Sequence, residues 1–117
     1  MSNNLSRFSR SERLLGKTAM EKLASSRVAV FGVGGVGGYC VEALARSGIG
    51  SIALIDADEV ALSNLNRQII ALSSTIGKDK VEVAKNRILD INPDCEVQTY
   101  KIYYNKDTQN DFDLSSY

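Results

Sequence analysis

The chain has 117 residues, of which 44% are apolar and 24% are charged, a balance typical of one globular domain or of part of one. Fourteen basic residues offset fourteen acidic ones, so no overall charge draws the chain to nucleic acid or to an anionic membrane, although a local basic patch stays compatible with this balance. The sequence shows no signal peptide and no long apolar segment, and we therefore expect a cytoplasmic protein without a membrane span.

The two cysteines give no support to a metal centre. Cys40 and Cys95 lack C-x-x-C spacing, and the chain contains no histidine to join them. A zinc site of the Cys/His kind and a Cys–His nucleophile are therefore not indicated, and we predict no metal ligands of this type. Cys40 is expected to be a small apolar residue on the inner face of a helix.

The N-terminal stretch combines arginines with an amphipathic helix. Residues 1–6 are polar, and we expect them to be frayed. A helix is predicted over residues 11–24, and its apolar side would dock on the sheet or on a partner. That side consists of Leu14, Leu15, Ala19 and Leu23. The arginines Arg7, Arg10 and Arg13 either form a solvated helix start or include one that reaches a phosphate group in a neighbouring subunit.

Residues 27–58 form the centre of the predicted fold. A continuous apolar strand is expected over residues 28–31, as in a parallel sheet that is covered on both faces. A G-x-G-x-x-G pattern follows, made by Gly32, Gly34 and Gly37 with Gly35 inside it. In this pattern the first glycine allows a tight turn, the second lets a phosphate approach the backbone, and the third lets helix and strand pack closely.

The helix after the glycines is predicted to begin near Val36 and to end at the glycine signal of residues 47–50. Its buried face is expected to hold Val36, Cys40, Val41 and Leu44. An anion at the glycine turn would face the free N–H groups of this helix. The next strand, residues 52–55, leads to Asp56, about twenty residues beyond the last glycine, where a carboxylate accepts both ribose hydroxyls of a nucleotide.

A long connection, residues 59–79, places polar side chains just outside the carboxyl end of the second strand. This edge of an open parallel sheet is where ligands bind. The side chains with a predicted binding role are Asn64, Arg67 and Gln68. Asp58, directly before this loop, is either a surface turn residue or a weak candidate for holding magnesium.

A further helix is predicted from Lys80 to Asn92, because apolar residues recur there at helical spacing and a proline follows Asn92. Lys80 opposes the dipole at the helix start, and this position indicates a compensating anion. A third strand is expected over residues 96–102. The tail, residues 103–117, is polar and has no clear period.

These elements predict an α/β fold, the first half of a Rossmann-like three-layer parallel sheet with strand order 3-2-1. The first strand would lie at an edge although its sequence is of the most buried type. A fourth strand should cover that edge by the right-handed crossover rule. Either a second copy pairs there, or the chain is the front part of a longer protein, and we favour the latter.

Two enzyme classes compete for the glycine pattern and Asp56. The chain has no G-x-x-x-x-G-K-[ST], which excludes a P-loop kinase or GTPase. A nicotinamide dehydrogenase has little use for cations after the second strand. An ATP-dependent adenylating enzyme needs them, because charge builds on the phosphate oxygens and on the departing pyrophosphate. Arg67 and Lys80, with an N-terminal arginine, supply that set, and a magnesium ion would share the work.

The chain resembles the ubiquitin-activating-enzyme-like superfamily, the ThiF/MoeB/HesA group. The motifs that carry this resemblance are RFSR at residues 7–10, GVGGVG at 32–37, DAD at 56–58, SNLNRQ at 63–68, GKDK at 77–80 and INP at 91–93. It implies ATP-dependent adenylation of a carboxylate in a homodimer. It also implies that Asp56 binds ribose, that Asn64 and Arg67 contact phosphates, and that Lys80 holds the triphosphate. Arg10 or Arg13 would reach the ATP of the partner subunit.

Within this superfamily, the sequence around Arg7, Phe8 and Gly16, with EALARSGIG and LIDADEV, is most similar to the branch that uses ATP to cyclise a threonylcarbamoyl group on tRNA. The second interpretation is an activator of a ubiquitin-like sulfur carrier protein. A third is a nucleotide-binding module without catalysis, against which Arg67 and Lys80 argue.

The departure from the family pattern lies at the C-terminus. The family carries an aspartate motif for magnesium on a fourth strand and, later, a cysteine region and a substrate surface. The 117 residues hold none of these, so we expect residues 1–117 to be the N-terminal part of one ATP-binding domain and to be inactive by themselves.

Overall fold

Three parallel strands form the frame of the fold. In the computed structural model, which describes residues 7–117, β1 (Arg27–Phe31), β2 (Ser51–Ile55) and β3 (Glu96–Tyr100) make one sheet in the order β1-β2-β3. Val28 pairs with Ile52, and Ile52 pairs with Val97, in parallel register. The α/β class and the 3-2-1 order are confirmed. The expected fraying of residues 1–6 lies outside the described residues.

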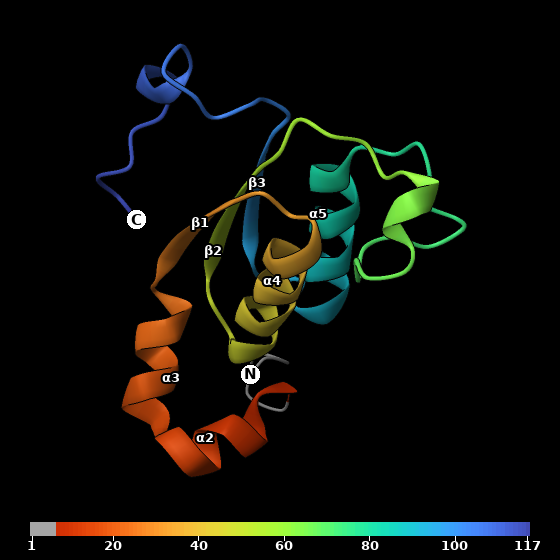
Figure 1. The fold of residues 1–117 in the computed structure, drawn as a ribbon. Helices are drawn as coiled ribbons and strands as arrows, with labels where there is room; N and C mark the ends of the chain where they lie inside the picture. The colour runs from red at the N-terminus through yellow and green to blue at the C-terminus, as the bar shows by residue number, and fades with distance from the viewer. Residues whose placement is uncertain (1–6) are drawn as a thin grey trace.

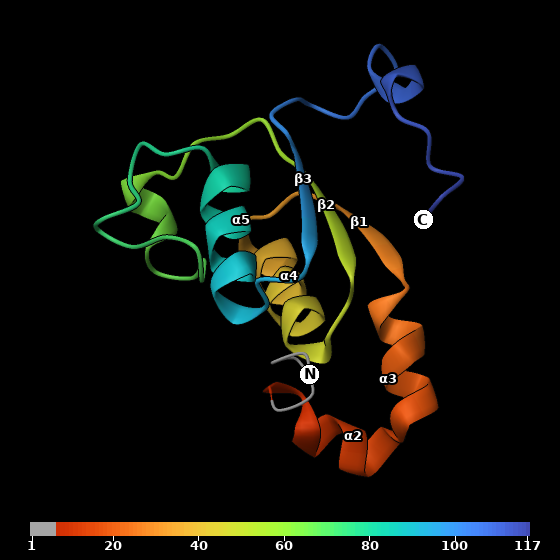
Figure 2. The ribbon, with the colours of Figure 1, turned by 180° about the vertical axis from the view of Figure 1, so that it is seen from behind.

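Two helices cover one face of the sheet (Figures 1 and 2). They are α4 (Gly35–Ser47) and α5 (Lys80–Ile91), each following one strand and returning to the next. Alternate strand residues point to this face. The core between sheet and helices consists mainly of Val30, Ile52, Leu54, Val41, Ala45, Val81, Ala84 and Ile88, all buried.

The N-terminal helix is interrupted, contrary to the single helix predicted over residues 11–24. α2 (Ser9–Leu15) and α3 (Lys17–Ala24) meet at Gly16, whose φ of 87° is left-handed and cannot continue a helix. This break turns Leu14 outward, where it is 84% exposed, and Leu15 is exposed as well. Leu23 packs against the core as expected, whereas the α2 leucines do not dock on the sheet, and their docking on a partner stays a prediction.

The buried face of α4 is also rotated from the predicted one. Val36 is 89% exposed and Cys40 is exposed, whereas Gly38, Val41 and Ala45 are buried. The cause is a glycine in the first turn of α4. A Cβ at Gly37 would stand 1.7 Å from the carbonyl oxygen of Gly32, so the helix packs against the glycine turn on the side of Gly37. Val36 therefore faces outward. As predicted, α4 ends at a left-handed glycine, Gly48.

The tail, residues 101–117, lies on the side of the sheet away from α4 and α5 (Figures 1 and 2). β3 ends at Tyr100, two residues before the predicted end. Phe112 in the tail contacts Phe31 and Tyr100, with ring centroids 6.2 Å and 5.1 Å apart. Tyr117 lies under the guanidinium of Arg27, 5.3 Å from carbon to ring centroid. The tail thus runs back to the beginning of β1.

The remaining described elements are two short 3-10 helices, η1 (Leu62–Asn64) and η2 (Gln109–Asp111). η1 lies in the long loop between β2 and α5, and η2 lies in the tail. Within residues 7–117 no strand pairs with the outer edge of β1, so the expected fourth strand stays a prediction.

Candidate nucleotide-binding site

The glycine turn between β1 and α4 has the geometry that close approach to an anion needs. Gly32 has a φ of 87°, and its N–H donates to the carbonyl oxygen of Ile55 at 2.8 Å, which ties the turn to β2. α4 has no side-chain cap and no acidic residue in its first turn. A Cβ at Gly35 would meet nothing within 4 Å. The turn therefore offers free N–H groups and open space at a helix N-terminus.

Asp56 joins this turn to the end of β2. Its Oδ2 accepts the N–H of Val33 and its Oδ1 accepts the N–H of Asp58, each at 2.9 Å. Each carboxylate oxygen retains a further lone pair, so the group still has acceptors for hydroxyl groups. Asp56 thus sits at the predicted place, at the carboxyl end of β2, with its orientation held by two backbone amides.

A cavity of about 300 Å³ opens beside Asp56. Its walls come from the ends of β1 and β2 and from the segment after β3, including Phe31, Asp58, Ile102, Tyr103 and Tyr104. Aromatic walls beside a carboxylate suit a ribose and its base. The sequence analysis missed the two tyrosines, although two aromatic residues directly after a strand were the signal that could have found them.

Tyr103 also links this cavity to Asp58. Its hydroxyl donates to Oδ1 of Asp58 at 3.1 Å, and this hydrogen bond raises the pKa of the Tyr103 phenol. The second oxygen of the Asp58 carboxylate has no hydrogen-bond partner among residues 7–117. One carboxylate oxygen at the mouth of the cavity fits the way magnesium is held by a single carboxylate together with phosphates. Within the described residues, no group of three His, Cys, Asp or Glu could hold a metal.

The loop between β2 and α5 places two predicted residues by local hydrogen bonds. Asn64 is buried, and its Oδ1 accepts the N–H of Ala61 at 2.8 Å. The Nη1 of Arg67 donates to the carbonyl oxygen of Ser63 and to Oδ1 of Asn66, both at 2.9 Å, so the exposed guanidinium is held on its own loop.

Gln68 brings this loop against the glycine turn. A Cβ at Gly34 would stand 3.3 Å from the Nε2 of Gln68, so the side-chain amide lies directly on the turn. Gln68 is only 8% exposed, and its Oε1 is buried without a hydrogen-bond partner in the described part of the chain. Because buried polar atoms are normally paired, this atom indicates a hydrogen-bond donor from outside residues 7–117.

Lys80 is a cation close to this loop, and most of the residue is buried. It is the first residue of α5, and its N–H donates to the carbonyl oxygen of Asp58 at 3.0 Å. Only 6% of the residue is exposed, but its ammonium nitrogen is not among the buried side-chain atoms of residues 7–117 that lack a hydrogen-bond partner. The nearby carboxylate of Asp79 is taken by Lys101 at 2.8 Å. A cation in the first turn of a helix opposes the helix dipole, and an anion beside it would offset this effect.

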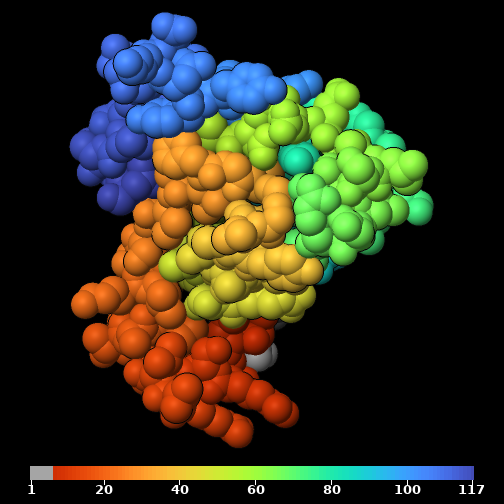
Figure 3. All heavy atoms as spheres, in the orientation of Figure 1, coloured from red at the N-terminus to blue at the C-terminus, as the bar shows by residue number. Residues whose placement is uncertain are grey.

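The N-terminal arginines do not join this site within one chain. Arg10 and Arg13 lie on α2, at the end of the molecule opposite the glycine turn, while the loop of residues 59–79 lies on the upper right (Figures 1 and 3). Arg10 instead lines a separate cavity with arginines of α4 and α5. The structure therefore brings together Gly32, Gly34, Asp56, Gln68 and their neighbours, but not the α2 arginines.

A parallel sheet with a glycine turn, an uncapped helix and an acidic residue at the end of the second strand defines a nucleotide-binding α/β domain. The sequence model of the ThiF family matches residues 8–115, and the chain therefore belongs to the ThiF family. The resemblance stated from the motifs is confirmed.

Individual relatives agree with this assignment. A tRNA threonylcarbamoyladenosine dehydratase of Bacillus subtilis (strain 168) is 53% identical over 108 residues, which are 92% of this chain and 42% of that protein. The adenylyltransferase and sulfurtransferase UBA4 of Lodderomyces elongisporus is 48% identical over 82 residues, 70% of this chain and 18% of that protein. The crystal structure of the E. coli tRNA N6-threonylcarbamoyladenosine dehydratase in complex with ATP superposes with a TM-score of 0.87 at 44% identity.

That superposition covers 89% of this chain and 43% of the E. coli protein. The chain thus spans about two-fifths of the length of the dehydratases that it matches. Within residues 7–117, no helix is both long enough and apolar enough to cross a membrane.

Proposed function

We propose that this chain forms the ATP-binding part of an enzyme that adenylates a carboxylate, and that the enzyme is a tRNA threonylcarbamoyladenosine dehydratase. The observation that carries the proposal is the glycine turn before α4, an uncapped helix N-terminus beside the oriented carboxylate of Asp56. The dehydratase of B. subtilis, identical at 53% of aligned positions, supports the choice of substrate.

In this proposal, each part of the site binds a different part of ATP. The amides of the glycine turn and the N-terminus of α4 hold the phosphates, with Asn64, Arg67 and Lys80 around them. Asp56 accepts hydrogen bonds from the ribose. The base lies in the cavity beside Tyr103. Gln68, whose amide lies on the turn, contacts the same phosphates.

The reaction would be an in-line displacement at the α-phosphate. An oxygen of the substrate carboxylate bonds to phosphorus as the bond to pyrophosphate breaks, which leaves an acyl adenylate and pyrophosphate. Negative charge grows on the departing oxygens, and Arg67 and Lys80 stabilise it. Magnesium, held by the phosphates and by the second oxygen of Asp58, would neutralise part of that charge. The activated threonylcarbamoyl group then cyclises as AMP leaves.

The proposal includes a homodimer in the cytoplasm, where ATP and tRNA meet. The position of Arg10 and Arg13 supports it, because these residues lie away from the glycine turn of their own chain. In a dimer, one of them would reach the ATP of the partner subunit.

A second function is favoured by the 48% identity to the adenylyltransferase and sulfurtransferase UBA4. It is the activation of a ubiquitin-like sulfur carrier protein at its C-terminal glycine. The ATP site would be the same, and only the acceptor of AMP would differ.

ATP–pyrophosphate exchange separates the two functions. The complete gene product is incubated with labelled pyrophosphate, ATP and magnesium, and either tRNA bearing threonylcarbamoyladenosine or a small protein that ends in two glycines is added. We expect exchange with the tRNA and none with the protein. Exchange with the protein alone would assign the chain to the sulfur-carrier activators, and exchange with neither acceptor would contradict both functions.

A further inference from the structure

A second cavity, of about 550 Å³, lies at the end of the molecule opposite the glycine turn. α2 forms one wall, and the C-terminal ends of α4 and α5 form the others. The charged residues of the lining are Arg7, Arg10, Arg46, Arg87 and Asp90. The lining thus contains four guanidinium groups and one carboxylate, and a second carboxylate, that of Glu42, pairs with two of the four.

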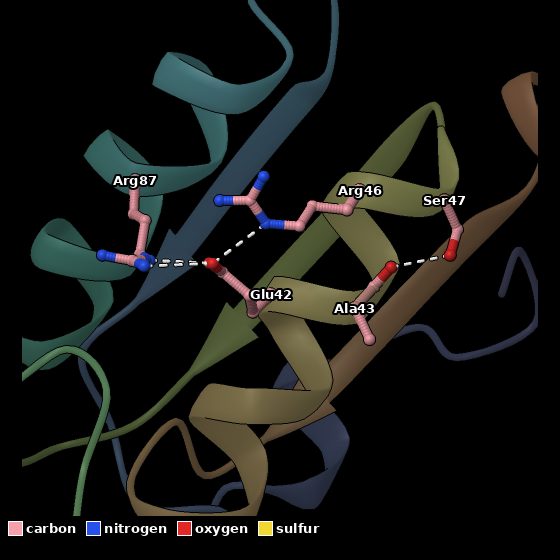
Figure 4. Close-up of polar contacts among 5 residues, drawn as sticks. All are labelled: Glu42, Ala43, Arg46, Ser47 and Arg87. Atoms are coloured by element: carbon pink, nitrogen blue, oxygen red, sulfur yellow. Dashed lines mark hydrogen bonds and ion pairs between the residues drawn. The ribbon is translucent and has the colours of Figure 1, made fainter. Parts of the chain in front are cut away.

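One half-buried carboxylate, that of Glu42, orients two of these arginines. The side chain of Glu42 is 14% exposed, and it accepts hydrogen bonds from Nε of Arg46 at 3.0 Å and from Nε of Arg87 at 2.6 Å (Figure 4). Nη2 of Arg87 also donates to Glu42, at 3.0 Å. Both Nη groups of Arg46 and Nη1 of Arg87 have no partner among residues 7–117. Donors are thus left over on two guanidinium groups whose orientation is already set.

The hydrogen-bond donors of this cavity suit a phosphate group. Arginine presents a planar fork of N–H donors that matches phosphate oxygens two at a time, and fixing the fork in advance lowers the entropy cost of binding. The hydroxyl groups of Ser9 and Ser11 add further donors to the lining, and Ile91 gives it one apolar wall.

We propose that this cavity binds a phosphodiester group of an RNA chain, away from the glycine turn of the same chain. The proposal rests on the proposed function, in which the substrate is a tRNA. A tRNA is much longer than a domain of this size, so its backbone can contact the far end of the sheet while the modified base lies at the glycine turn. Phosphate contacts of this kind fix the position of a nucleic acid without reading its sequence.

The test is a salt series of tRNA binding. The complete gene product is titrated against a fluorescently labelled tRNA by anisotropy, for the wild type, Arg46→Gln and the double variant Arg46→Gln/Arg87→Gln. Arg46 is an exposed residue on the helix surface, so its substitution spares the core. We expect Arg46→Gln to weaken binding roughly tenfold. The slope of log affinity against log salt should become shallower by about 0.7–0.9 for each phosphate group that the variant no longer neutralises.

The matched control is Lys22→Gln on α3, which removes an exposed cation outside the cavity and should change neither quantity. ATP affinity should stay at the wild-type value in every variant. Wild-type tRNA affinity and slope in both arginine variants would overturn the inference and leave the proposed function standing. A wild-type protein that binds no tRNA would overturn both. Loss of ATP affinity with intact tRNA binding would assign the cavity to a nucleotide and also overturn the inference.

Discussion

Lys80 shows at the scale of one residue how a binding site places a charge where its own fold does not favour it. The residue is 6% exposed and lies in the first turn of α5, where the helix dipole is unfavourable for a cation. Gln68 adds a buried carbonyl oxygen that lacks a hydrogen-bond partner among residues 7–117. Both side chains adjoin the loop and turn that would surround a triphosphate.

Replacing Lys80 should therefore separate stability from binding. In Lys80→Met the charge that opposes the helix dipole is removed and the apolar stem is kept, so we expect the free energy of unfolding to stay equal or to rise by about 0.3–1 kcal/mol. ATP affinity should fall by roughly a hundredfold, because a hydrogen bond to a charged phosphate is removed. Thermal unfolding and calorimetric titration with ATP measure the two effects.

Lys85→Met on the same helix is the control for Lys80→Met. It should change neither quantity appreciably, since Lys85 makes no ion pair within residues 7–117. A Lys80→Met protein that is clearly destabilised but binds ATP normally would show that Lys80 has a structural role only.

At the scale of one element, α4 is positioned by a glycine in its first turn, Gly37. A Cβ at Gly37 would overlap the carbonyl oxygen of Gly32, whereas a Cβ at Gly35 would enter open space. The two glycines are two residues apart in the same helix, so they form a natural pair for comparison.

Gly37→Ala should lower the free energy of unfolding by about 2–4 kcal/mol, because α4 must move away from the glycine turn. Gly35→Ala should leave stability unchanged or slightly raised, since alanine favours the helix. Chemical denaturation measures both. Equal stability of the two variants would mean that the helix does not depend on this close approach.

A second element-scale interaction joins α4 to α5. The Glu42 carboxylate bridges Arg46 and Arg87, and the hydrogen bonds from Arg87 hold the pKa of Glu42 below its ordinary value of 4.5. A carboxyl group whose pKa is lowered by folding stabilises the native state above its unfolded pKa. This stability disappears as the pH falls through the lower, folded value.

Glu42→Gln should thus cost about 1 kcal/mol at pH 7, the magnitude of a partly exposed ion pair. The difference from the wild type should close as the pH falls below about 4.5. Urea denaturation across this range is the measurement, with Glu21→Gln on α3 as a control outside this ion pair. A difference that persists at low pH would assign the effect to packing and not to charge.

At the scale of the whole molecule, hydrophobic periodicity and motifs were sufficient to predict the sheet. The strand order, the glycine turn and the position of Asp56 follow from apolar runs separated by local signals, and local signals are what a sequence displays. The buried face of α4 was not predicted correctly. Val36 and Cys40 are apolar and have helical spacing, whereas Gly37, which sets the packing of the helix, has no side chain to enter such a pattern.

The cavity lined by arginines of α2, α4 and α5 could not be predicted from the sequence for a different reason. Arg10, Arg46 and Arg87 are distant in the chain, and the amphipathic pattern of each helix treats them as separate solvated residues. Only the packing of α2 under the ends of α4 and α5 brings them together. The two tyrosines after β3 were likewise interpreted as part of a polar tail.

The measurement that tests the adenylating assignment most directly is nucleotide binding by the complete gene product. ATP with magnesium and NAD are compared by calorimetric titration, on the wild type and on Arg67→Ala. We predict tighter binding of ATP than of NAD, with ATP affinity lowered by the substitution. Tighter binding of NAD that is indifferent to Arg67 would contradict the assignment and return the site to the dehydrogenases.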